Sequence, residues 1–280
     1  MNIVIVGLGV IGGSFAMCLK EAGYENVYGI DVNDETLVKA KNQGLIKEGY
    51  KDGSEILREA DITMLSIYPK YVTKFIRDNR EYFKKGSVIT DATGIKEMIV
   101  NEVLDILPND VDFVFGHPMA GREKRGIDFA SSQVFKGANY IITPTNHNKP
   151  ENVDLIEKLA FEMGFGRVRR ITPSVHDEMI GYTSQLPHAM AVALINSDEE
   201  HRDTGSFIGD SYRDLTRIAN INEDLWSELF LGNKENLLNS IKKFEEQLDI
   251  IKEALIEDNK EELIRCFIKS TKRRENLEKK

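Results

Sequence analysis

The sequence contains very little cysteine. Cys18 and Cys266 are the two cysteines in 280 residues, and they lie far apart in apolar stretches with a helical pattern. This placement provides neither a disulfide framework nor the close ligand spacing of a zinc site. We therefore expect a protein of the reducing cytoplasm with no bound metal.

Positive charge is also in short supply. The 37 lysines and arginines are outnumbered by 46 aspartates and glutamates, which gives a net charge of −9. Proteins that bind nucleic acid along its phosphate backbone present basic surfaces, so we expect no nucleic-acid partner. Small anionic ligands are a different case, because a few arginines and helix N-termini are enough to hold them.

Long apolar runs are missing as well. The uncharged stretch at 3–19 lacks the basic leader of a signal peptide and is interrupted by four glycines. No other stretch approaches the roughly 20 apolar residues that cross a bilayer, so we expect no membrane partner. The content of 41% hydrophobic and 30% charged residues is typical of globular domains. The length suffices for one large domain or two ordinary ones.

A glycine motif opens the chain. Residues 2–6 form an apolar, β-branched run that predicts a buried strand, and a helical pattern follows over 10–22. Between them, Gly7, Gly9 and Gly12 form G-x-G-x-x-G. The first glycine permits a tight turn, the second lets a pyrophosphate approach the backbone, and the third lets helix and strand pack closely. The motif predicts a dinucleotide site.

The second predicted strand, 26–31, ends in Asp31, which lies 24 residues beyond Gly7. An acidic residue at this place accepts hydrogen bonds from a ribose diol and repels a 2′-phosphate, which favours NAD over NADP. Val10, Ile11 and Ser66 complete the expected cofactor contacts. The alternative is an ordinary strand–helix turn followed by an unrelated capping aspartate.

Strands and helices alternate through the rest of the first half. Further strands are expected at 62–69, 87–94, 111–118, 139–144 and 166–173, and helices near 54–60, 70–83 and 96–107. This alternation predicts a Rossmann-like, doubly wound parallel sheet over residues 1–172. His117 follows one of these strands, and ligands of such sheets bind beyond the carboxyl ends of the strands.

The second half, 173–280, is expected to be an all-α domain. A helical pattern covers 174–197, with Pro187 marking a kink or a break. A heptad seam follows, made of Leu237, Ile241, Phe244, Leu248, Ile251 and Leu255. The seam indicates either plain core packing or a homodimer formed through these helices, and we expect the dimer. A turn at 258–259 and a last helix complete the prediction.

Three motifs remain, namely FGHPMAGREKRG at 115–126, HDEMIGYTSQLPHAMA at 176–191 and SYRDLTRIAN at 211–220. Together with the N-terminal glycines, they resemble the prephenate dehydrogenase family, which includes the arogenate dehydrogenases. The resemblance covers nearly the whole chain. It implies NAD-dependent oxidation of prephenate with release of CO2, which gives 4-hydroxyphenylpyruvate for tyrosine biosynthesis. Arogenate is the alternative substrate.

The resemblance also implies roles for individual residues. His117 accepts the proton of the ring hydroxyl, a task that suits a neutral imidazole. Arg217 pairs with a substrate carboxylate, His188 contacts the pyruvyl side, and Glu123 faces the substrate arginine at the mouth of the pocket. The alternatives are a surface pair of Arg217 with Asp214, a core histidine and a solvated loop glutamate. Asp177 either orients a neighbour or caps a helix.

Two positions depart from the family pattern. Many members carry a serine where Gly94 stands in DATGIK. We expect the neighbouring Thr93 to contact the substrate through its hydroxyl. Many members also have a histidine where Gln185 stands in SQLPH. Gln185 keeps its hydrogen-bonding capacity but cannot become cationic. Both departures bear on the choice between prephenate and arogenate.

Two rival functions are weaker. A β-hydroxyacid dehydrogenase has the same two-part plan and typically uses a catalytic lysine, for which Lys96 is the candidate. A non-enzymatic NAD sensor binds the cofactor without turnover, but it needs no proton acceptor such as His117. Any inhibition by tyrosine is expected to act at the active site, because no regulatory domain follows the helical half.

Overall fold

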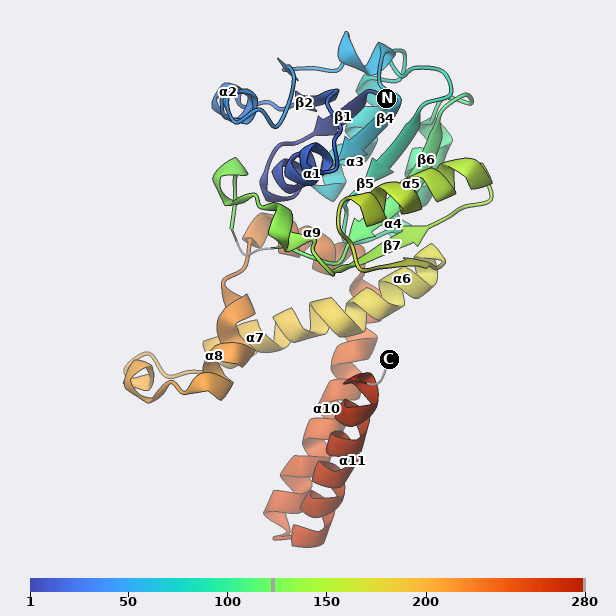
Figure 1. The fold of residues 1–280 in the computed structure, drawn as a ribbon. Coiled ribbons are helices and arrows are strands. Elements are labelled where there is room, and N and C mark those ends of the chain that lie inside the picture. Colours follow the sequence, from blue (N-terminus) through green and yellow to red (C-terminus); the bar gives the residue numbers. More distant parts are fainter. Residues whose placement is uncertain (122–123, 279–280) are drawn as a thin grey trace. The chain divides into compact units, whose positions relative to one another are not determined.

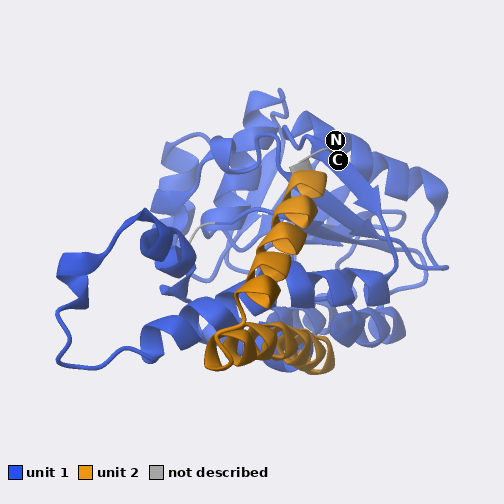
Figure 2. Cartoon of the chain, turned by 90° about the horizontal axis from the view of Figure 1, so that it is seen from below, with its two compact units in different colours: residues 1–233 blue, residues 234–280 orange. Residues whose placement is uncertain are grey.

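The computed structural model describes residues 1–121 and 124–278. The chain divides into two compact units, Met1–Asn233 and Lys234–Lys280, which Figure 2 shows in different colours.

The first unit is built on a sheet with the strand order β3-β2-β1-β4-β5-β6-β7-β8 (Figure 1). The strands are β1 Ile3–Val6, β2 Val27–Ile30, β3 Gly49–Tyr50, β4 Ile62–Leu65, β5 Val88–Asp91, β6 Asp112–Pro118, β7 Asn139–Thr143 and β8 Arg167–Arg170. The chain starts in the middle of the sheet and winds outward in both directions, so a switch point lies between β1 and β4. The predicted doubly wound α/β fold is confirmed.

The last two strands, β7 and β8, run against the other six, whereas the sequence led us to expect parallel strands throughout. β7 pairs with β6 in antiparallel register, with Phe115 opposite Thr143 and Pro118 opposite Tyr140. A parallel return needs a long crossover, usually a helix. The described part of the β6–β7 connection holds two short 3-10 turns instead, Ile127–Phe129 and Ser132–Val134.

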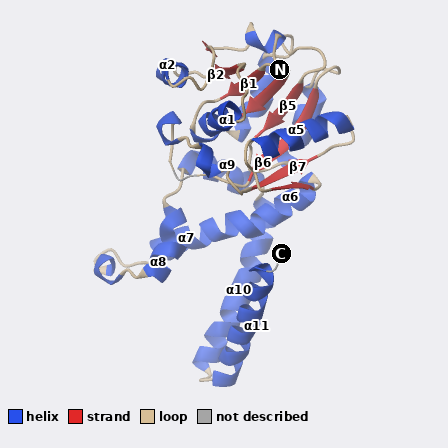
Figure 3. Cartoon of the chain, in the orientation of Figure 1, coloured by secondary structure: helices blue, strands red, loops and turns tan. Residues whose placement is uncertain are grey.

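Helices cover both faces of the sheet (Figure 3). They are α1 Val10–Glu21, α2 Asp34–Asn42, α3 Pro69–Asp78, α4 Glu97–Ile106 and α5 Pro150–Glu162. One apolar cluster joins the sheet to α1, α2 and α5 and includes Phe15 and Ile156, and a second joins it to α3 and α4 and includes Ile76 and Val103. The sequence patterns did not predict α2, α5 or the two-residue β3. The helix expected at 54–60 is a single 3-10 turn, Ile56–Arg58.

Helices replace strands after β8 in the described residues, as predicted. α6 Pro173–Ile180 continues through a π-helical turn, Gly181–Gln185, into α7 Leu186–Asn196. Pro187 lies two residues after the π-helical turn, and Gln185 and Leu186 before it have helical backbone angles, so the helix does not break there. The proline removes one helical N–H donor, and the irregularity lies in the turn that precedes it. The remaining elements are the 3-10 turns Thr204–Phe207 and Arg217–Ala219, α8 Asp210–Thr216 and α9 Glu223–Gly232.

The second unit is a pair of long helices, α10 Lys234–Ile256 and α11 Lys260–Glu278, which contact each other. Asp258 adopts a left-handed conformation with φ 50° between them, which confirms the predicted turn. Members of the predicted heptad seam differ in burial: Leu237 is buried, whereas Leu248 and Leu255 are 51% and 62% exposed. No helix in the described residues combines the length and apolar character that a bilayer span requires.

Candidate active site

Each of the three glycines of the N-terminal motif stands in a different structural environment. Gly7 has φ +83°, and a β-carbon there would lie 2.7 Å from the carbonyl oxygen of Ser66. A β-carbon on Gly12 would lie 1.9 Å from the carbonyl oxygen of Gly7, so helix and strand can approach only with glycine at 12. A β-carbon on Gly9 would meet nothing within 4 Å. Gly9 therefore leaves open space above the loop. We call Gly7, Gly9, Gly12 and Ser66 the nucleotide cradle.

Unpaired polar groups gather at this cradle. Gly9 begins α1 without a side-chain cap, so the N–H groups of Val10 and Ile11 in the first turn lack helical partners. The hydroxyl of Ser66 is buried and finds no hydrogen-bond partner among the described residues. A helix N-terminus with unused donors attracts phosphate. The residues present therefore fit a dinucleotide.

Asp31 follows β2 beside the cradle. Its Oδ2 accepts a hydrogen bond of 2.8 Å from the N–H of Leu8, and its Oδ1 accepts one of 2.9 Å from the N–H of Asn33. The cap of α2 is Asn33, whose side chain accepts from the N–H of Thr36. Asp31 is thus not the helix cap, and each of its oxygens retains a further lone pair for a diol.

His117 lies at the end of β6, at the same sheet edge as the cradle, because β1, β4, β5 and β6 run parallel. Its ring is partly buried, and its Nδ1 lies 2.8 Å from Nε2 of His176. Burial, followed by the nearby His176 and Lys96, lowers the pKa of His117 well below its ordinary value. The ring is therefore neutral at pH 7 and able to accept a proton.

His176 and Asp177, at the start of α6, continue from His117. Nδ1 of His176 lies 2.6 Å from Oδ1 of Asp177, and both side chains are buried. Asp177 also accepts hydrogen bonds from the backbone N–H groups of Lys96, at 2.9 Å, and Glu97, at 2.8 Å. These two N–H groups lie at the start of α4. Asp177 therefore caps a neighbouring helix and also orients the ring of His176.

Lys96 is fully buried, and its side chain contacts the end of the strand that carries His117. Its Nζ lies 2.6 Å from Oδ2 of Asp91 and 2.7 Å from the carbonyl oxygen of Gly116. Nζ also lies 2.9 Å from both the carbonyl oxygen and the hydroxyl of Thr93. Burial lowers the pKa of Lys96, and Asp91 opposes that shift. Lys96 thus spends its donors on the strand end that carries His117. We call His117, His176, Asp177, Lys96 and Asp91 the histidine network.

Gly94, at the position of the family serine, lies directly beside His117. A β-carbon on Gly94 would lie 3.7 Å from Nε2 of His117 and 3.3 Å from Leu229. The neighbouring Thr93 is buried, and its hydroxyl oxygen lies within hydrogen-bond distance of Asp91, of the carbonyl oxygen of Ile95 and of Nζ of Lys96. The hydroxyl of Thr93 is therefore already engaged within the histidine network.

Gln185 lies in the π-helical turn and is buried. Its Nε2 donates to the carbonyl oxygen of Leu229, and its Oε1 accepts from Nδ2 of Asn233, each at 2.8 Å. Asn233 also donates to the carbonyl oxygen of Asp177. Both ends of the Gln185 amide thus connect α9 to the turn beside α6.

His188 and Arg217 lie on elements that contact each other, α7 and the 3-10 turn Arg217–Ala219. Nδ1 of His188 lies 2.8 Å from the carbonyl oxygen of Ser184, and its ring stacks on Trp226 with centroids 3.7 Å apart. Trp226 and Leu229 are three residues apart on α9 and so share a face. Since Leu229 lies beside Gly94, α9 contacts both the ring of His188, through Trp226, and the loop that carries Gly94.

Some residues lie outside this group or were missed. Glu123 lies outside the described residues. Trp226, His176 and Asp91 were not predicted as parts of a site. The HDE tripeptide could have pointed to His176, and the acid–lysine pair in DATGIK could have pointed to Asp91.

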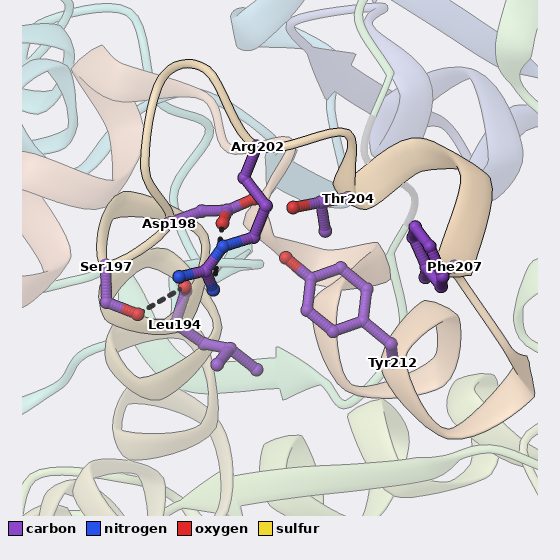
Figure 4. A pocket seen from close by; sticks show the side chains of 7 residues that line it. All are labelled: Leu194, Ser197, Asp198, Arg202, Thr204, Phe207 and Tyr212. Carbon is purple, nitrogen blue, oxygen red and sulfur yellow. Dashed lines mark hydrogen bonds and ion pairs between the residues drawn. The ribbon is translucent and has the colours of Figure 1, made fainter.

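A separate hollow lies at the end of α7 (Figure 4). It is lined by Leu194, Ser197, Asp198, Arg202, Thr204, Phe207 and Tyr212. None of the predicted site residues is among them. The guanidinium of Arg202 is paired with Asp198 and Glu199, so it does not provide an unpaired cation for a ligand.

Comparison with known proteins decides the family. The model of the prephenate dehydrogenase nucleotide-binding domain matches residues 15–168, and that of the dimerization domain matches residues 172–269. The chain belongs to the prephenate dehydrogenase family. Prephenate dehydrogenase of Bacillus subtilis is 28% identical over 273 residues, which are 95% of this chain and 73% of the relative.

Two solved structures of family members resemble the whole chain. Prephenate dehydrogenase of A. aeolicus, in complex with hydroxyphenyl propionate and NAD+, has a TM-score of 0.90 at 31% identity, covering 99% of this chain and 98% of that chain. Synechocystis arogenate dehydrogenase has a TM-score of 0.83 at 26% identity, covering 99% and 100%. The family thus includes enzymes named for either substrate.

Proposed function

We propose that this chain catalyses the NAD-dependent oxidative decarboxylation of prephenate to 4-hydroxyphenylpyruvate. The observation that carries the proposal is His117, a neutral imidazole at the same sheet edge as the nucleotide cradle. NAD as the cofactor is supported by the fit of the cradle, by Asp31, and by the A. aeolicus relative, which binds NAD+. Gly7, Gly9, Val10, Ile11, Gly12 and Ser66 hold the pyrophosphate side, and Asp31 holds the ribose diol.

The reaction needs one proton acceptor and one source of oxidation. NAD, when bound at the nucleotide cradle, would supply the acceptor for the hydride that leaves the carbinol carbon. His117 accepts the hydroxyl proton as the C–O bond becomes a carbonyl. The ring carboxylate then leaves as CO2, its bonding electrons enter the ring, and the ring oxygen regains a proton. The product is a phenol, so aromatisation drives the last step.

The substrate carries two carboxylates, for which we propose Arg217 and His188 as partners. A guanidinium can bind a carboxylate through two parallel hydrogen bonds. Glu123 is proposed at the substrate side, and Thr93 and Gln185 stay predicted contacts. Their hydrogen bonds within the protein favour a supporting role for both.

Arogenate is the second candidate substrate. The similarity to Synechocystis arogenate dehydrogenase favours it, and Gly94 and Gln185 depart from the family pattern at positions that bear on the choice between the two substrates. Initial rates with prephenate and arogenate, each with NAD and NADP, separate these options. We expect the highest kcat/KM for prephenate with NAD. A higher kcat/KM for arogenate would make arogenate the substrate. Turnover of neither compound would refute the proposed function.

We propose that the chain forms a homodimer through its helical half, residues 173–280, with the boundary to the nucleotide-binding domain at 172. The match to a dimerization domain over 172–269 supports this. The apolar side chains of Leu248, Leu255, Phe267 and Ile268 are half or more exposed in the single chain. Sedimentation analysis should give twice the mass of the chain. The cytoplasmic location stays a prediction.

A further inference from the structure

The hydrogen bonds that run from Asp177 to His117 have a defined direction. Oδ2 of Asp177 accepts from the backbone N–H of Glu97, and both carboxylate oxygens lie within hydrogen-bond distance of the N–H of Lys96. Backbone N–H groups can only donate, so they fix Asp177 as the acceptor at the start of α4. The start of a ten-residue helix also favours a negative charge at this point.

The direction passes through His176 to His117. Since Asp177 accepts, Nδ1 of His176 carries the proton of their 2.6 Å hydrogen bond. A neutral imidazole has one N–H, so Nε2 of His176 is an acceptor. Nδ1 of His117, 2.8 Å away, must then be the donor. Nε2 of His117 is left without a proton, and it is the nitrogen beside Gly94.

We propose that His176 and Asp177 are positioning residues that fix the tautomer of His117, so that Nε2 is the atom that accepts the substrate proton. The inference rests on the proposed function for its kinetic consequence. Once Nε2 is protonated, His117 is cationic, and its Nδ1–H points along the same hydrogen bonds toward Asp177. Asp91 is already paired with Lys96, so Asp177 is the carboxylate that offsets the new charge.

The substitution Asp177→Asn is expected to reverse the direction of the hydrogen bonds between residue 177, His176 and His117. Oδ2 is the oxygen within hydrogen-bond distance of both backbone N–H groups, 3.2 Å from that of Lys96 and 2.8 Å from that of Glu97. The amide oxygen of the asparagine therefore takes the Oδ2 position, where it can accept from both, and its NH2 group takes the Oδ1 position. The NH2 group then donates to Nδ1 of His176, whose Nε2–H donates to Nδ1 of His117. The proton of His117 moves to Nε2, where it blocks proton acceptance.

The test is ¹⁵N NMR of histidine-labelled protein without substrate, combined with steady-state kinetics. His117 and His176 are assigned from His117→Asn and His176→Gln. In the wild type, we expect both rings to carry their proton on Nδ1. In Asp177→Asn, we expect both to carry it on Nε2, and kcat to fall on the order of 10²–10⁴-fold with KM changed less than about threefold. Glu178→Gln, the same change at the exposed neighbouring acid, is the matched control and should alter neither.

Three results would overturn the proposal. A wild-type His117 with its proton on Nε2 contradicts the direction of the hydrogen bonds, and this spectrum needs no variant to fold. Unchanged tautomers in Asp177→Asn contradict the role of Asp177, and a full tautomer exchange with unchanged kcat contradicts Nε2 as the accepting atom. Lack of turnover by the wild type would refute the proposed function instead, while the spectra would still decide the tautomers.

Discussion

The nucleotide cradle and the histidine network lie at the same edge of one sheet but are built differently. The cradle consists of backbone: Gly12 allows helix and strand to approach, and Gly9 leaves space open. The histidine network consists of buried side chains whose charges are compensated by one another, such as Lys96 with Asp91. The three glycines of the cradle lie within residues 7–12, and Ser66 joins them from the end of the neighbouring strand β4. The histidine network depends on elements far apart in the chain, since 59 residues separate His117 from His176.

The largest effect is expected in the histidine network, from His117→Asn. Removal of the proton acceptor should lower kcat on the order of 10²–10⁴-fold, because general-base catalysis contributes that much. The dissociation constant of NAD, measured by fluorescence titration, should be unchanged because the cradle is untouched. His147→Asn, at an exposed position, is the control. A variant that retains more than a tenth of the wild-type kcat would exclude His117 as the acceptor.

Lys96→Met should cause the next largest change, and it affects stability. It leaves Asp91 buried without its cation, which costs about 3–5 kcal/mol when one partner of a buried pair is removed. Urea unfolding measures the loss. Lys85→Met removes a lysine whose side chain is 90% exposed and should be nearly neutral. Equal effects of the two substitutions would contradict the structural role of Lys96.

Two alanine substitutions separate the functions of glycines within the nucleotide cradle. Gly12→Ala places a β-carbon 1.9 Å from a carbonyl oxygen and should lower the free energy of unfolding by about 3 kcal/mol. Gly9→Ala meets nothing within 4 Å, so its unfolding should change by less than about 1 kcal/mol while NAD binding weakens. Urea unfolding measures the stability of both variants, and calorimetric titration measures their affinity for NAD. Unimpaired NAD binding by Gly9→Ala would argue against pyrophosphate above residue 9.

The smallest of these effects is expected for Arg217→Ala. Loss of a charged hydrogen bond to a substrate carboxylate should raise KM roughly 10-fold with little change in kcat. Initial-rate kinetics with prephenate measure this. Arg213→Ala, which removes a largely exposed arginine on the neighbouring helix, is the matched control. If both variants keep the wild-type KM, Arg217 does not bind substrate.

These differences explain how far the sequence predicted the structure. The turn at Gly7 and Gly12 was predictable because both glycines meet a steric requirement of the strand–helix turn, and Asp31 lies directly after β2, where the strand prediction put it. The direction of β7 was not, because the β6–β7 connection carries no signal as clear as a crossover helix. Asp177 was ambiguous between orienting a neighbour and capping a helix, and it does both, for partners about 80 residues away. Such long-range pairing has no local pattern.

The pH dependence of kcat/KM for prephenate tests the central claim most directly. The pKa of His117 is depressed in the folded protein, so the base stays unprotonated as pH falls through 6.5, the ordinary histidine value, and activity is lost only at lower pH. We predict an acidic limb below pH 6.5 for the wild type and no such limb in the residual activity of His117→Asn. An acidic limb at or above pH 6.5, or one that persists in His117→Asn, would contradict a neutral His117 as the proton acceptor.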